Sequence, residues 1–109
     1  MNLAQKKCTP CEGGARPLEG EAIGRYQTML AGSWEVSENK KIRKEFTFKD
    51  FVGSIAFVNK VAAIAEEEGH HPDLTIMYSK VRVELWTHAI GGLSENDFIL
   101  AAKIDEIDK

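Results

Sequence analysis

The segment from Thr47 to Gly69 reads TFKDFVGSIAFVNKVAAIAEEEG and carries the clearest local folding signals in the chain. Thr47 can cap a helix, Asp50 three residues later completes a capping box, and Phe46 with Phe51 would form the hydrophobic staple beside it. Gly69 tolerates the left-handed backbone that commonly follows the end of a helix. The segment therefore predicts a helix that begins after Thr47 and ends at Gly69.

Apolar side chains cover more of this predicted helix than one face. Those spaced alternately four and three residues apart are expected to face a sheet: Phe51, Ile55, Val58, Ala62 and Ala65. Further apolar side chains extend the apolar surface beyond that face: Val52, Ala56, Val61 and Ile64. Either the helix is deeply buried in its own subunit, or it also packs against another subunit. We expect a homodimer or homotetramer, with Val52, Ala56 and Ile64 toward the partner and Phe51, Ile55 and Ala62 in the subunit's own core.

A helix and a hairpin are predicted before this segment. Apolar residues near a helical period predict a first helix over residues 18–30. Segments 34–36 and 42–48 are rich in β-forming residues and flank the polar turn Ser37-Glu38-Asn39-Lys40, which predicts a hairpin. We expect residues 1–17 to be an irregular N-terminal lead-in and residues 18–109 to form a single domain.

A second hairpin and a last helix are predicted after it. Strands are expected over residues 74–77 and 81–86, the latter with alternating apolar and polar side chains. Ser94 and Asp97 form a predicted capping box, with Leu93 and Phe98 as its staple, for a helix that runs to about residue 108. The order α-β-β-α-β-β-α predicts an α+β fold, in which a four-stranded antiparallel sheet has helices packed on one face.

Length and charge narrow the classes of function. A chain of 109 residues with 43% hydrophobic content can bury one core without obligatory disulfides. The net charge is −3 and both signs are interspersed, so we expect no direct contact with nucleic acid. No segment approaches the roughly 20 apolar residues that span a bilayer, and the N-terminus does not resemble a leader. We therefore expect a cytoplasmic protein that does not bind membranes.

Both cysteines lie in the N-terminal lead-in, in Cys8-Thr9-Pro10-Cys11. Their spacing is that of a redox pair or half a zinc site, but the other ligands of a zinc site are missing nearby. The Gly- and Pro-containing surroundings indicate irregular structure rather than the strand and helix of a redox motif. We expect both cysteines to be dispensable and assign them no catalytic role.

All three histidines lie close to the predicted second hairpin. His70 and His71 follow the end of the long helix, and Pro72 holds His71 in an extended conformation. His88 ends the last predicted strand. Because antiparallel pairing brings the start of one strand beside the end of the next, we expect the three rings to meet at one rim of the sheet. Histidine exchanges protons near neutral pH, so such a cluster favours acid/base catalysis.

Zinc is the rival use of such a cluster. Adjacent His70 and His71 are not a usual ligand spacing, and no cysteine or carboxylate falls in an evident metal motif, so we expect no metal. Glu66 begins three consecutive glutamates at a helix C-terminus, where the helix dipole disfavours negative charge; Glu66 could instead orient a histidine. Asp97 has a sufficient structural explanation as a member of its capping box.

Together these residues resemble the signature of the pterin-4a-carbinolamine dehydratases, over a region from about Trp34 to the C-terminus. The pattern comprises Glu66, His70-His71-Pro72, Tyr78, His88 and Asp97. A similar Cys-x-x-Cys lead-in is present in some microbial and plant members. The resemblance implies dehydration of a 4a-hydroxytetrahydropterin to the quinonoid dihydropterin, in support of tetrahydrobiopterin recycling and without cofactor or metal.

The resemblance also implies roles for individual residues. It implies His70, His71 and His88 as the catalytic and substrate-binding set, Pro72 and Thr87 as further substrate-binding residues, and Glu66 and Asp97 as supporting residues. We expect His70 and His88 to transfer the protons, and His71 to contact the pterin or act as a second acid/base.

Two alternatives stay open. Some members of the family are dimerisation cofactors of a homeodomain transcription factor, a role that would use the long helix rather than the histidines. The second alternative is that the protein is an enzyme of another pterin pathway.

Overall fold

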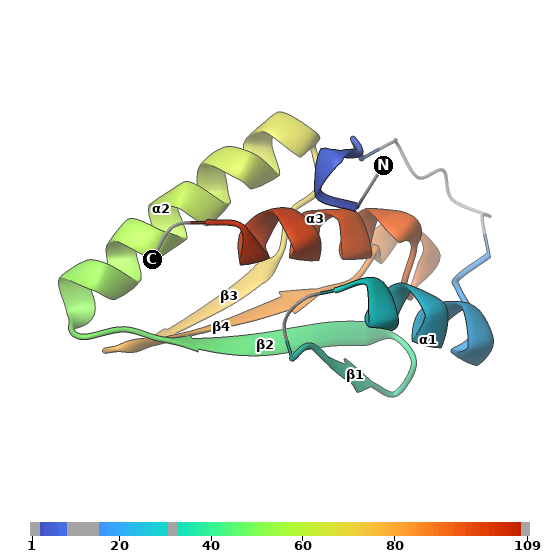
Figure 1. Ribbon diagram of the computed structural model, residues 1–109, viewed down its shortest axis with the longest axis horizontal. Coiled ribbons are helices and arrows are strands. Elements are labelled where there is room, and N and C mark those ends of the chain that lie inside the picture. The colour runs from blue at the N-terminus through green and yellow to red at the C-terminus, as the bar shows by residue number, and fades with distance from the viewer. Residues whose placement is uncertain (1–2, 9–15, 31–32, 108–109) are drawn as a thin grey trace.

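The computed structural model describes residues 3–8, 16–30 and 33–107. Its main elements follow the predicted order α-β-β-α-β-β-α, with helices on one face of a four-stranded antiparallel sheet (Figure 1). They are α1 (Gly20–Met29), β1 (Glu35–Ser37), β2 (Lys41–Thr47), α2 (Phe51–Glu68), β3 (Asp73–Met77), β4 (Lys80–Leu85) and α3 (Glu95–Asp105). Two short 3-10 helices, η1 (Leu3–Gln5) and η2 (His88–Ile90), add to this order. The predicted fold class is thus confirmed.

The strand order in the sheet is β1-β2-β4-β3, so β3 is an edge strand. Phe46 of β2 lies opposite Val81 of β4, and Ile76 of β3 lies on the other side of Val81. Alternate residues point to opposite faces of a sheet, so this apolar row lies on one face. The intervening row of Glu45 and Arg82 lies on the open face.

The predicted turn between the first two strands has the geometry of a tight hairpin. Glu38 and Asn39 have φ angles of 54° and 56°, and the Lys40 N–H donates to the Ser37 carbonyl at 2.9 Å. Successive left-handed residues give a turn whose twist matches that of the paired strands. This turn fixes the register in which Val36 lies opposite Ile42.

The core lies between the sheet and the helices. Phe98, Leu100 and Ile104 of α3 have no exposed surface. At the edge of this core the Trp34 indole N–H donates to Asp105 at 2.9 Å, and the Lys44 ammonium donates to the same carboxylate at 2.8 Å. Asp105 thereby ties the end of α3 to β2 and to the residue before β1.

The start of α2 differs from the prediction. Asp50 is the N-cap, and its carboxylate accepts the Gly53 N–H at 2.8 Å. Thr47 belongs to β2, where it lies opposite Lys80. The expected Thr47 cap and its capping box are therefore wrong, because the pairing of β2 with β4 extends to Thr47. The end of α2 is as predicted, since Gly69 is the C-cap with a φ of 66°.

The buried face of α2 also differs from the one expected. It consists of Ser54, Phe57, Val61 and Ala65. Phe51 is 48% exposed and Ala62 is exposed, although both were expected in the core, whereas Ile64, expected toward a partner, packs against the core. The reason is Phe57, whose ring lies 4.7 Å from that of Phe46 and 5.0 Å from that of Phe48. This aromatic cluster fixes the rotation of the helix.

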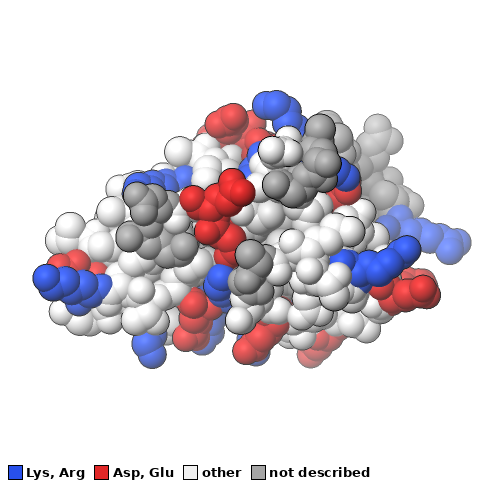
Figure 2. All heavy atoms as spheres, in the orientation of Figure 1, with Lys and Arg blue, Asp and Glu red and all other residues white. Residues whose placement is uncertain are grey.

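Two further features of the described residues concern a membrane and charged partners: the character of their helices and the distribution of their surface charge. None of their helices has the length and apolar character needed to cross a bilayer. On the face shown in Figure 2, acidic and basic side chains alternate between uncharged areas.

Candidate active site

The three histidines lie at one rim of the sheet, where α2 ends, β3 begins and the chain leaves β4. A cavity of about 450 Å³ opens there. Its lining comes from the end of α2, the segment after β4, the start of α3 and the N-terminal segment: Cys8, Glu68, Gly69, His70, His71, Trp86, Thr87, His88, Ala89 and Asn96. The structure thus brings His70, His71 and His88 to one cavity.

His70 is held by Asp97. The Nε2 atom of the ring lies 2.6 Å from Asp97 Oδ1, and the two side chains are 12% and 0% exposed. The other oxygen, Oδ2, accepts the Thr87 hydroxyl and the Ser94 N–H, each at 2.9 Å. An ionised carboxylate only accepts hydrogen bonds. His70 therefore donates its Nε2–H to Asp97, which leaves Nδ1 as the nitrogen that can accept a proton.

Asp97 has a second contact that the sequence predicted. Together with Ser94 it forms the capping box at the start of α3. The same carboxylate therefore begins α3 and orients His70. Thr87 is 4% exposed and also bonds Ser94 through their hydroxyls at 2.8 Å, so it belongs to this network as well as to the cavity wall.

His71 and Glu66 form a second, more exposed pair. His71 Nε2 lies 2.5 Å from Glu66 Oε2, with 61% and 78% of the two side chains exposed. Glu66 lies on the last turn of α2, and His71 follows Gly69 and His70. Glu66 is thus placed to orient His71 rather than His70, and its effect on the ring is weakened by solvent.

His88 does not lie on a strand, contrary to the expectation, because β4 ends at Leu85 and His88 begins η2. The Thr87 N–H donates to the Gly92 carbonyl at 2.8 Å, which closes this short loop. The exposed His88 ring lies with its centroid 4.0 Å from that of Trp86. Trp86 in turn donates its indole N–H to Asp73 at 3.1 Å. His88 and Trp86 thus form an aromatic surface at the cavity.

Two residues of the sequence pattern are placed apart from the cavity lining. Tyr78 lies in the β3–β4 turn with a φ of 52° and is 68% exposed. It is therefore at the opposite end of β3 from His70. Pro72 is not among the described residues that line the cavity. Its role in substrate binding stays a prediction.

Sequence reasoning missed six residues of the lining: Cys8, Glu68, Gly69, Trp86, Ala89 and Asn96. Trp86 precedes His88 by two residues, a spacing that could have revealed it. Glu68 follows Ala65 by three residues and so continues the buried face of α2. Cys8 gave no such signal: from the sequence we assigned it no catalytic role, and the structure places it in the cavity lining. That both cysteines are dispensable stays a prediction. Cys11 lies outside the described residues.

The surroundings of Cys8 disfavour its thiolate form. Burial, followed by the nearby Glu68 carboxylate, raises the pKa of Cys8 to about 12. Its Sγ atom lies 3.6 Å from the Asn96 carbonyl oxygen. At neutral pH the side chain is therefore a neutral, largely apolar group at the cavity wall.

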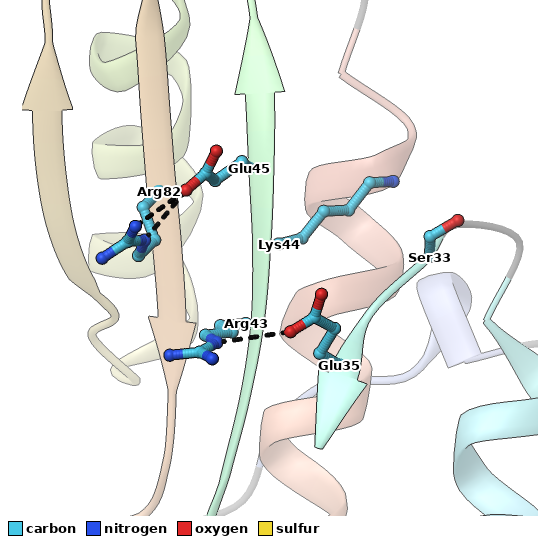
Figure 3. Close-up of a pocket in the computed structure, with 6 residues that line it drawn as sticks. All are labelled: Ser33, Glu35, Arg43, Lys44, Glu45 and Arg82. Atoms are coloured by element: carbon cyan, nitrogen blue, oxygen red, sulfur yellow. Dashed lines mark hydrogen bonds and ion pairs between the residues drawn. The ribbon is translucent and has the colours of Figure 1, made fainter. Parts of the chain in front are cut away.

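A larger hollow of about 600 Å³ lies beside strands β1, β2 and β4 (Figure 3). Four of its charged side chains form two pairs: Arg82 donates to Glu45 at 2.8 Å, and Arg43 lies 3.5 Å from Glu35. The fifth, Lys44, donates to Asp105. The hydrogen bond from Arg82 lowers the pKa of Glu45. These are cross-strand ion pairs of an exposed sheet face, and the hollow lacks the histidines.

The described residues contain no group of three or more His, Cys, Asp and Glu side chains arranged to hold a metal ion. The carboxylates near the histidines instead make hydrogen bonds with His70 and His71.

Comparison with known proteins gives a consistent result. Residues 16–107 match the family described as Pterin 4 alpha carbinolamine dehydratase. A protein of Rickettsia bellii, provisionally named a pterin-4-alpha-carbinolamine dehydratase, is 53% identical over 104 residues, which cover 95% of this chain and 92% of that protein.

Two solved structures share the fold. One, described as a transcriptional coactivator/pterin dehydratase from Brucella melitensis, has a TM-score of 0.76 and 31% identity over 83% of this chain and 96% of its own. The other, a pterin dehydratase-like protein described as a RuBisCO assembly factor in the alpha-carboxysome, has a TM-score of 0.59 and 27% identity over 69% of this chain and 88% of its own. The chain therefore belongs to the pterin 4 alpha carbinolamine dehydratase family, a family of hydro-lyases.

Proposed function

We propose that this protein dehydrates a 4a-hydroxytetrahydropterin, the hydroxylated product of aromatic amino acid hydroxylases, to the quinonoid dihydropterin and so supports tetrahydrobiopterin recycling in the cytoplasm. The observation that carries the proposal is the meeting of His70, His71 and His88 at one cavity, with His70 hydrogen-bonded to the buried carboxylate of Asp97. The family assignment supports the substrate class.

The reaction needs one proton to be given and one to be taken. The C4a–O bond breaks, the hydroxyl group accepts a proton and leaves as water, and a ring nitrogen of the pterin loses a proton. No electrons are gained or lost. Imidazoles can act as both acid and base near neutral pH, so this chemistry requires neither a metal ion nor an organic cofactor.

We assign the base to His70 and the acid to His88. The bond from His70 Nε2–H to Asp97 leaves Nδ1 free to accept the ring proton, and Asp97 stabilises the imidazolium that forms. His88 is exposed at the cavity, which supports its assignment as the group that protonates the leaving hydroxyl. His71, oriented by Glu66, contacts the pterin or serves as a second acid/base, and the Trp86 ring offers a flat surface for a flat bicyclic substrate.

The test is the rate of quinonoid dihydropterin formation from a 4a-hydroxytetrahydropterin after extensive chelation of metals. We expect full activity in the chelated enzyme. Loss of activity on chelation with recovery on addition of zinc would overturn the acid/base mechanism. An inactive wild-type protein would overturn the substrate assignment and favour another pterin pathway.

A second candidate function is protein binding through α2, and the exposed surface of this helix favours it. A hollow of about 350 Å³ on α2 is lined by Phe51, Val52, Ile55, Ala56 and Asn59. The two solved relatives are described as a transcriptional coactivator and as an assembly factor, roles that involve other proteins. We propose that this surface, named the α2 face, mediates homo-oligomerisation or the binding of a partner protein.

The two candidate functions can be separated by substitution. His88→Ala should lower the rate of dehydration by roughly 10²-fold or more and leave association through the α2 face intact. Val52→Glu should do the reverse. Loss of both properties in either variant, with the fold retained, would contradict the separation.

A further inference from the structure

We propose that the N-terminal segment, residues 3–8, forms a wall of the histidine cavity and sets its affinity for the pterin, with Glu68 as the positioning residue that holds the wall in place. This inference rests on the proposed function and extends it to a part of the chain that precedes the family match, which begins at residue 16.

The segment is docked along α3 rather than extended into solvent. Figure 1 shows η1 beside α3, and Leu3 of η1 is only 5% exposed within the core. The Lys103 ammonium of α3 donates to the Ala4 carbonyl at 2.8 Å. Lys6 lies 2.8 Å from Glu95 at the other end of α3. These contacts tie the segment to both ends of the helix that carries Asp97.

Glu68 joins this segment to the cavity. It is the last residue of α2, and its side chain is 5% exposed, whereas the preceding Glu66 and Glu67 are exposed. Its Oε1 atom accepts the Cys8 N–H at 2.8 Å, and its Oε2 atom lies 3.8 Å from Lys103. A carboxylate is rarely buried without partners, and here the partners are the segment and the lysine that also holds Ala4.

Cys8 is the residue of the segment that lines the cavity, beside Glu68 and Asn96. A neutral thiol offers the pterin an apolar contact rather than a proton. None of its hydrogen bonds involves a histidine, since its N–H bonds Glu68 and its Sγ lies near Asn96. Changes at Cys8 should therefore alter how tightly the substrate fits, and not the acid/base groups that act on it.

The first experiment compares Cys8→Leu with the matched control Lys7→Leu in the full-length protein. Lys7 is adjacent and exposed, and it is not part of the lining, so both variants receive the same side chain in neighbouring positions. We expect Cys8→Leu to raise KM for the 4a-hydroxytetrahydropterin by roughly fivefold or more with kcat within about twofold of wild type, because it removes cavity volume without touching the histidines. Lys7→Leu should change neither constant.

The second experiment tests the positioning role of Glu68. Glu68→Ala removes the acceptor of the Cys8 N–H and should raise KM. Glu68→Gln keeps an acceptor oxygen and should restore a near-normal KM. Glu67→Ala, on the exposed side of the same turn, is the control. Because Cys8→Leu leaves Glu68 and Lys103 in place, it keeps the proposal testable if Glu68→Ala does not fold.

Equal KM values for Cys8→Leu and Lys7→Leu, in an active wild-type enzyme, would overturn this inference and leave the proposed function standing. A fall in kcat with unchanged KM would also overturn it. An inactive wild-type protein would overturn the proposed function and this inference together. The two failures are distinguishable because one appears only in the variants and the other in the unmodified protein.

Discussion

His70 differs from the other two histidines because its ring is both part of the cavity and the partner of a fully buried carboxylate. The His70 side chain is 12% exposed and that of Asp97 is 0% exposed, whereas 61% of the His71 side chain is exposed and His88 is exposed as well. Removing His70 therefore leaves a buried oxygen of Asp97 without its ring donor, whereas removing His88 leaves no buried group unpaired. Activity and stability should respond differently to the two substitutions.

We predict that His70→Ala and His88→Ala each lower turnover by roughly 10²-fold or more, the scale of a positioned acid or base. His70→Ala should also lower the free energy of unfolding by about 1–3 kcal/mol, because a buried acceptor loses its donor. His70→Gln places an amide N–H near Asp97 and should recover much of that stability without recovering turnover. The measurements are steady-state kinetics and urea unfolding.

Near-normal turnover in either alanine variant, with loss of turnover in Asp97→Ala, would contradict the assignment of the acid and base. Equal destabilisation by His70→Ala and His88→Ala would contradict the special position of His70.

The raised pKa of Cys8 gives a second prediction at this scale. The pKa is raised from 9.0 to about 12, first by burial and then by Glu68, so the thiolate is scarce at pH 8. In a Cys11→Ser variant we expect Cys8 to react with an aromatic disulfide reagent roughly tenfold or more slowly than the same protein unfolded in urea, after allowance for the greater nucleophilicity of a high-pKa thiolate. Equal rates in the two states would show that Cys8 is not held in the wall.

At the scale of secondary structure, α2 shows what the sequence could and could not reveal. Its end at Gly69 and its wide apolar surface followed from local signals. Its rotation did not, because Phe57 faces inward only through contacts with Phe46 and Phe48 on the sheet side. Helical spacing alone fits two apolar faces one residue apart, and packing against the sheet decides between them. The exposed face that results includes Val52, which is 76% exposed.

We predict that the protein is a homo-oligomer assembled through the α2 face and that Val52→Glu or Ala56→Glu dissociates it. A carboxylate buried without a partner at an interface costs several kcal/mol, about 3–5 where one member of a buried pair is lost. Thr28→Glu, on the exposed surface of α1, is the control and should leave the assembly intact. Sedimentation equilibrium gives the answer, and a monomeric wild-type protein at micromolar concentration would contradict the prediction.

The docking of η1 on α3 should depend on pH. The hydrogen bond from Lys6 lowers the pKa of Glu95 below its usual 4.5, and Glu95 raises the pKa of Lys6 above 10.5. A carboxyl whose pKa is lowered by folding adds stability above its unfolded pKa and loses it as the pH falls through the folded pKa. The wild type should therefore lose more stability between pH 5 and pH 3 than Glu95→Gln does. Parallel losses in the two proteins would contradict a contribution from this ion pair.

At the scale of the whole molecule, the lining of the histidine cavity comes from four separate parts of one chain. The sequence predicted the meeting of His70, His71 and His88, because antiparallel strands bring the start of β3 beside the end of β4. It did not predict the N-terminal wall, which depends on contacts between residues 60 to 99 positions apart in sequence, such as that of Cys8 with Glu68 and that of Ala4 with Lys103. The spacing of apolar residues within a short segment of sequence cannot predict contacts between residues so far apart.

Because the lining of the histidine cavity shares no residue with the α2 face, we predict that the dissociated Val52→Glu subunit keeps its dehydratase activity if it stays folded. The measurement is kcat/KM across a dilution series that spans the dissociation of the assembly. A specific activity that falls in parallel with the oligomer fraction would show that a partner subunit completes the site.

The structural role of Asp97 affects which residues can indicate catalytic activity in relatives of this protein. Its carboxylate caps α3 with Ser94 and also bonds His70 and Thr87, so it contributes to the fold whether or not any pterin is turned over. His88 makes no comparable contribution to the fold, since its ring is exposed. A descendant that abandoned the chemistry but kept the fold would be free to lose His88 long before Asp97. Among family members with roles in assembly or transcription, the residue at position 88 is therefore the informative marker of retained catalysis, and an aspartate at position 97 is not.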